Sequence, residues 1–174
     1  MALLEKVTDE KTASPVVQEV FAAMRQAVGD VPEPLKMLAV SPGLLQVQAA
    51  MIGYYGGHAA LSPELLTCIR FVAASHFENI ACVRFNAGLL KRQGMTEEEL
   101  EELKVKPLAA PLEDKDRLML SFVAKAVTGV EATAEAMGKL RDVGFQDSDI
   151  LDAVNHGFAM YAPGKMLKFF GLSS

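Results

Sequence analysis

Apolar residues recur with helical spacing along most of the chain, and this pattern predicts an all-helical protein. In residues 15–28 the apolar positions fall three or four residues apart and form one stripe. Ser14 and Pro15 before this stripe are typical of a helix N-terminus, and Gly29 after it is typical of a C-terminus. No alternating run of β-branched residues is flanked by hairpin turns, so we expect no sheet.

The same pair, serine followed by proline, recurs at residues 41–42 and 62–63. The first of these opens a segment that ends near residues 56–57, and the second opens one that reaches residues 76–79. Short connections join the helical segments, so we expect a bundle of seven or eight helices. We also expect one domain, residues 1–174, because a chain of this length is close to the size of a single domain.

Two later segments, residues 94–100 and 144–150, resemble each other. Each begins with glycine and an apolar residue, follows a helix with a basic last turn, and places acidic residues at the start of the next helix. In the first segment, Thr96 and Glu99 have the spacing of a capping box. The two segments therefore predict an internal repeat of a helix–turn–helix unit.

The stretch at residues 37–63 contains no Asp, Glu, Lys or Arg. Glycine and proline interrupt it, and its unbroken apolar part is about ten residues, whereas a membrane-spanning helix needs about 20. We therefore expect no membrane contact, and a helix that is buried in the core or between the subunits of a homo-oligomer.

Composition and charge exclude several classes of function. The 17 basic residues against 22 acidic ones make a nucleic-acid-binding face improbable, and two cysteines do not form a disulfide framework. The first eleven residues have no apolar core of a signal peptide, and we expect a cytoplasmic protein. The three histidines, His58, His76 and His156, have no metal-ligand spacing, and no phosphate-binding glycine loop is present, so the sequence predicts no metal and no cofactor.

A helix corner near Asn79 is the best candidate for chemistry. Cys82 would lie in the first turn of the helix after the corner, where unpaired backbone N–H groups and the helix dipole favour a thiolate. In an antiparallel hairpin that turns at Asn79, His76 would lie opposite Cys82 and supply or accept its proton. A buried apolar role is equally open for Cys82, and His76 is open to a core role. We expect Cys68, eleven residues before the corner, to be structural, and His156 to be a core residue.

The chain resembles the carboxymuconolactone decarboxylase and alkylhydroperoxidase D-like (AhpD-like) family in the following residues: Leu61-Ser62-Pro63-Glu64-Leu65, Val72-Ala73, Cys82, and Gly94-Met95-Thr96-Glu97-Glu98-Glu99. The resemblance extends from about residue 15 to residue 170. It implies an all-α fold, an internal two-unit repeat and a homo-oligomer.

The redox members of this family carry a glutamate, a CxxC cysteine pair and a histidine that relays protons. At the matching positions this chain has Thr67, Asn79, Cys82 and Asn86, so only the second cysteine is retained. The redox dithiol centre is therefore degenerate, since Asn79 and Cys82 cannot form a disulfide and an asparagine at position 86 cannot relay protons.

Three functions remain open at this stage. The first is a peroxidase-like thiol oxidoreductase of the antioxidant type, in which Cys82 forms a sulfenic acid, His76 supplies the proton and an external thiol restores the cysteine. The second is a decarboxylase-like lyase that uses the same pocket without a thiol. The third is a non-catalytic descendant that binds a small molecule or acts as a scaffold.

Overall fold

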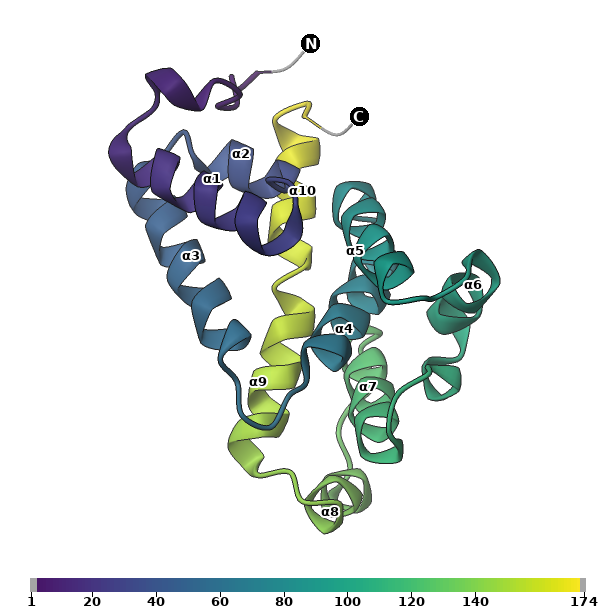
Figure 1. The fold of residues 1–174 in the computed structure, drawn as a ribbon. Coiled ribbons are helices and arrows are strands. Elements are labelled where there is room, and N and C mark those ends of the chain that lie inside the picture. Colours follow the sequence, from purple (N-terminus) through teal and green to yellow (C-terminus); the bar gives the residue numbers. More distant parts are fainter. Residues whose placement is uncertain (1–2, 173–174) are drawn as a thin grey trace.

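The computed structural model describes residues 3–172, and this part of the chain is helical with no strand (Figure 1). The all-α prediction is therefore confirmed. The elements are, in chain order, η1 (Glu10–Thr12), α1 (Pro15–Val28), α2 (Glu33–Leu38), α3 (Pro42–Gly56), α4 (Pro63–His76), α5 (Ile80–Arg92), α6 (Glu97–Val105), η2 (Pro107–Ala109), α7 (Asp114–Val127), α8 (Ala134–Asp142), α9 (Asp147–Phe158) and α10 (Tyr161–Phe169).

The described residues contain ten α-helices, more than the seven or eight that the sequence pattern predicted. Two features of the chain explain the difference. The helix α2 has only six residues, too few for an apolar stripe to repeat along it. Only residues 159–160 separate α9 from α10, so the sequence there resembles one continuous helix.

The two predicted helix–turn–helix units have the same local geometry. Gly94 after α5 and Gly144 after α8 have φ angles of 101° and 102°, a left-handed conformation that favours glycine. The residue after each glycine, Met95 or Phe145, is buried, and its N–H donates to a carbonyl five positions back. This is the Schellman motif, and a capping box then opens α6 and α9. The internal repeat is thus present in the backbone.

The helix α4 lies at the centre of the fold, where it packs against α5, α7 and α9. Nine of its 14 residues are buried. In Figure 1 α9 and α10 follow one another through the middle of the molecule, with α1, α2 and α3 on one side and α4 to α7 on the other. The apolar core forms two clusters. The first is built mainly on α4, α7 and α9, and the second on α1, α2 and the end of α10.

The charge-free helix α3 is not a core helix, because only Leu45 and Tyr55 on it are buried. Leu44, Val47 and Tyr54 are 50%, 67% and 56% exposed. An exposed apolar face of this kind is typical of a contact surface between subunits. The homo-oligomer stays a prediction, and α3 is where we expect the contact. No helix within residues 3–172 combines the length and the apolar character needed to cross a bilayer.

We predict that Gly164→Ala destabilises the protein, because Gly164 on α10 packs against the corner between α4 and α5. A Cβ atom there would lie 2.8 Å from the Cβ atom of the buried Asn79. Overpacking of this kind costs about 1–3 kcal/mol of the free energy of unfolding. Gly138→Ala on α8 is the matched control, since no atom lies within 4 Å of the Cβ it would add. It should stabilise the protein by about 0.5–1 kcal/mol. Urea unfolding measures both, and an equal loss in the two variants would contradict the packing argument.

Candidate functional site

A cavity of about 460 Å³ lies between α1, α2 and α3 on one side and α4, α5, α9 and α10 on the other. This volume is in the range of small-molecule sites. Its walls are mainly aliphatic and aromatic, and none of the aspartates and glutamates whose side chains the structure describes lines it. The polar lining residues are Gln48, Tyr55, Thr67, Arg70, Cys82, Asn86, Gln93 and His156.

The hairpin formed by α4 and α5 brings residues 67, 82 and 86, three of the four positions compared above with the redox motif, into this cavity. Thr67 on α4 and both Cys82 and Asn86 on α5 line it, and all three are buried. Cys82 and Asn86 lie one helical turn apart, and the Asn86 Nδ2 donates to the Cys82 carbonyl at 2.8 Å. The structure therefore places residues 67, 82 and 86 around one cavity.

Asn79, the fourth position, caps α5 and does not line the cavity. Its Oδ1 accepts a hydrogen bond from the Cys82 N–H at 3.3 Å, and its Nδ2 donates to the Met160 carbonyl at 2.9 Å. The chain enters this cap through Glu78, which has a φ of 55°, and the Asn79 N–H donates to the Ala74 carbonyl at 2.9 Å. Asn79 therefore holds the corner closed and ties it to the junction of α9 and α10.

The Cys82 thiol is more strongly protonated than the sequence suggested. Burial raises its pKa to about 11, although the hydrogen bond from Asn79 and the charge of Arg70 act in the opposite direction. The N–H group of Cys82 is already paired with Asn79, so it is not a free donor near the sulfur. Cys68 is 1% exposed and does not line the cavity, and burial raises its pKa to about 12.

The structure does not bring His76 to Cys82. His76 is the exposed last residue of α4, its ring lies against Phe77 at a centroid distance of 5.3 Å, and it does not line the cavity. The reason is helical phase. His76 lies six residues beyond Arg70, which faces the cavity, and six residues turn a helix by about 240°. The predicted pairing of thiol and histidine thus placed His76 on the wrong face of α4.

Arg70 is the charged group of the cavity, and sequence reasoning missed it. Its Nε donates to the Asn86 Oδ1 at 2.8 Å, its Nη2 to the Thr67 Oγ1 at 3.0 Å, and its Nη1 contacts the His156 Nε2 at 3.1 Å. All three partners are neutral acceptors. Burial lowers the pKa of Arg70 to about 10, which still leaves the guanidinium charged at neutral pH. A signal was present in the sequence, because Arg70 is the one charge within the apolar residues 65–74.

His156 lines the cavity as a neutral hydrogen-bond acceptor. Burial lowers its pKa to about 3, the charge of Arg70 acts in the same direction, and a hydrogen bond with the Leu66 backbone opposes them. Its ring packs on Tyr55 with a centroid distance of 4.1 Å. His156 is 6% exposed, so the expectation of a buried core residue is confirmed. That expectation did not include the contact of its Nε2 atom with Arg70.

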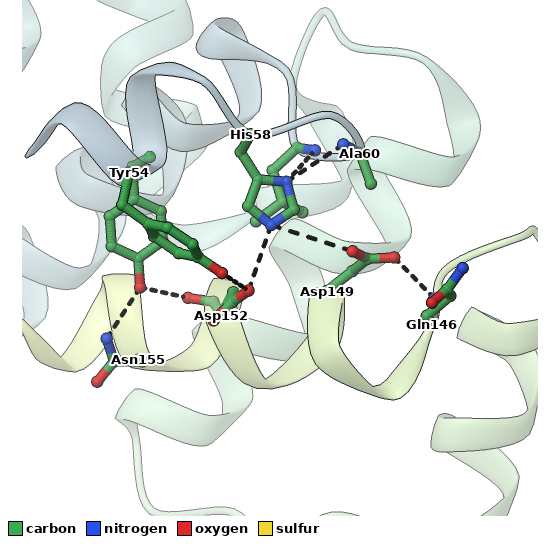
Figure 2. Close-up of polar contacts among 9 residues, drawn as sticks. Tyr54, His58, Ala60, Gln146, Asp149, Asp152 and Asn155 are labelled. Carbon is green, nitrogen blue, oxygen red and sulfur yellow. Dashed lines mark hydrogen bonds and ion pairs between the residues drawn. The ribbon is translucent and has the colours of Figure 1, made fainter. Parts of the chain in front are cut away.

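A polar network lies next to this wall of the cavity, and Figure 2 shows Tyr54 and His58 of this network in contact with Asp152 on α9. The Tyr55 hydroxyl donates to the Asp152 carbonyl at 3.0 Å and accepts from the Asn155 Nδ2 at 2.9 Å. The His58 Nδ1 accepts from the backbone N–H groups of residues 60–61, so its Nε2 carries the proton toward the Asp152 carboxylate at 3.3 Å. The network joins the end of α3 and the following loop to α9.

We predict that Cys82 reacts with iodoacetamide in the folded protein and that Cys68 does not. Because the pKa of Cys82 is raised to about 11, its thiolate fraction and alkylation rate should increase about tenfold per pH unit from pH 7 to pH 10. Intact-mass measurements on Cys68→Ala and Cys82→Ala assign the reactive thiol. A rate that levels off near pH 7, or labelling that persists in Cys82→Ala, would contradict this prediction.

We also predict that His58→Ala lowers the free energy of unfolding by about 1–3 kcal/mol, because two backbone N–H groups lose their acceptor. His76→Ala is the matched control, since His76 is exposed, and it should change stability by less than about 0.5 kcal/mol. His76→Ala should also leave the Cys82 alkylation rate unchanged. A large loss of that rate would show that His76 reaches the thiol after all.

No protein-family model matches the sequence, and no curated protein matches it. Solved structures do match its fold. An uncharacterized peroxidase-related protein from Silicibacter sp. TM1040 has a TM-score of 0.77 at 24% identity, over 99% of this chain and 94% of that chain. A second uncharacterized peroxidase-related protein, an alkylhydroperoxidase AhpD core from Ralstonia eutropha JMP134, has a TM-score of 0.76 at 18% identity, over 97% and 90%.

The debrominase Bmp8, in complex with 2,3,4-tribromopyrrole, has a TM-score of 0.71 at 14% identity, over 98% of this chain and 88% of that chain. These likenesses span nearly the whole chain. The protein has the all-helical fold of the alkylhydroperoxidase AhpD core.

Proposed function

We propose that this protein reduces small organic hydroperoxides with a single thiol, that of Cys82. The observation that carries the proposal is the position of Cys82 on the wall of an apolar cavity that also holds the cation Arg70. Two solved structures with this fold are peroxidase-related proteins, and a third binds 2,3,4-tribromopyrrole. These neighbours support a cavity that accepts small organic molecules.

The reaction needs one hydroperoxide and two molecules of an external thiol. The Cys82 thiolate attacks an oxygen of the hydroperoxide, an S–O bond forms, and the O–O bond breaks. Sulfur is oxidised to sulfenic acid, and the leaving alkoxide takes up the proton that the thiol released and becomes an alcohol. One external thiol then displaces water to form a mixed disulfide, and a second releases Cys82 as a thiol and leaves as a disulfide.

The residues around Cys82 support an external rather than an internal reductant. Asn79 stands three positions before Cys82 and has no sulfur, and Cys68 does not line the cavity. The charge of Arg70 favours the thiolate, because it acts to lower the pKa of Cys82 against the effect of burial. Because the pKa of Cys82 is raised to about 11, we expect the reaction to be slow at pH 7 and to accelerate with rising pH.

The same raised pKa favours a second candidate, binding of a small molecule without turnover. The cavity is large enough for a ligand, and its thiol is largely protonated at neutral pH. A lyase has less support. No carboxylate of the described side chains lines the cavity, and His156, with its pKa lowered to about 3, is a weak base.

Cumene hydroperoxide tests the proposal directly. We expect it to convert Cys82 to a sulfenic acid that dimedone traps, as detected by mass spectrometry, and dithiothreitol to sustain formation of the alcohol. Cys82→Ala should abolish both signals, whereas the matched variant Cys68→Ala should retain them. Alcohol formation that persists in Cys82→Ala would refute the thiol mechanism. Absence of any trapped sulfenic acid at pH 9 would leave binding without turnover as the function.

A further inference from the structure

We propose that Arg70 is the anchor for an anionic ligand, and that the cavity takes a molecule with an apolar body and one carboxylate. This inference deepens the proposed function by naming its substrate class. It rests on the proposed function in one respect only, which is that the hydroperoxide group is the part of the ligand that reacts with Cys82.

The first argument is the missing counter-ion of Arg70. A charge that is removed from water is costly unless an opposite charge or several hydrogen bonds compensate it. None of the carboxylates whose side chains the structure describes pairs with Arg70, and its hydrogen-bond partners are the neutral side chains of Thr67, Asn86 and His156. The cavity therefore holds a positive charge that no described residue neutralises.

The second argument is that the neighbours of Arg70 are fixed as acceptors. The Thr67 hydroxyl donates its hydrogen to the Pro63 carbonyl at 2.7 Å, so its oxygen is left to accept from Arg70. The Asn86 amide group donates to the Cys82 carbonyl, so its oxygen is turned toward Arg70. These contacts hold the guanidinium in one orientation, and preorganisation of this kind lowers the entropy cost of binding.

The third argument is the number of N–H groups that remain. An arginine has five N–H donors, and the three contacts use one on each nitrogen. One N–H on each terminal nitrogen is therefore left for a ligand. Carboxylates are suited to this group because they accept two parallel hydrogen bonds from a guanidinium.

The rest of the cavity defines the body of the ligand. Apolar side chains from α1 to α5 and from α10 line it, among them Leu35, Ile52, Leu66 and Leu89. Among the described lining residues, Arg70 is the only lysine or arginine, and none is acidic; His156 is neutral because its pKa is lowered to about 3. A monocarboxylate with an alkyl or aryl body fits this distribution, whereas a second charge would find no partner there.

Octanoate and 1-octanol are matched probes, since they differ mainly in the carboxylate. Isothermal titration calorimetry at pH 7.5 should show octanoate binding to the wild-type protein about tenfold to a hundredfold more tightly than 1-octanol, as expected for charge-assisted hydrogen bonds. Arg70→Met should lose this preference, and Arg70→Lys should keep part of it, because lysine retains the charge but not the planar group.

Cys82→Ala separates this inference from the proposed function, because it removes the thiol and should keep the preference for octanoate. If octanoate binds but Cys82 is never oxidised, the ligand class holds and the peroxidase proposal fails. Equal affinity of the wild-type protein for both probes, binding of neither, or a preference retained in Arg70→Met would overturn the inference. If Arg70→Met does not fold, the wild-type comparison and Arg70→Lys decide the question.

Discussion

The side chain of Asn79 fixes the corner between α4 and α5, and the cavity depends on this corner. One amide group caps the first turn of α5 and also binds the carbonyl of Met160 at the junction of α9 and α10. These two contacts set the angle at which α5 returns along α4, and with it the positions of Cys82 and Asn86 opposite Thr67. Gly164 allows α10 to approach the same amide, so the corner and the C-terminal helices form one packed unit.

Asn79 stands at the position where the redox motif compared in the sequence analysis has its first cysteine. A cysteine at position 79 would provide a second sulfur but would lack both the acceptor for the Cys82 N–H and the donor to Met160. The charged group of this cavity is Arg70, which neutral side chains hold.

Local features of the sequence were sufficient to predict the fold, but only part of the site. Helix periodicity, the glycine ends and the capping residues act over a few neighbours, so the all-α architecture and the repeated unit could be predicted. Cys82 was found because its place after a corner is also a local feature. The contact between Arg70 and His156 was missed because it depends on how α9 packs on α4, which no local pattern in the sequence predicts. His76 was misplaced because counting residues from the turn of a helical hairpin predicts which residues lie level with each other along the two helices. It does not predict the face of the helix on which each residue lies.

The division of the apolar core into two clusters has a consequence for motion. Leu35 and Leu38 belong to the cluster built on α1, α2 and α10, Leu66 and Tyr55 belong to the cluster built on α4, and all four line the cavity. The cavity thus lies along the boundary between two apolar clusters, and α3 joins them because it contributes to both. A change in the width of the cavity would then move side chains at this boundary without opening either cluster. The polar side chains on α4 and α5 would keep their places during such a change.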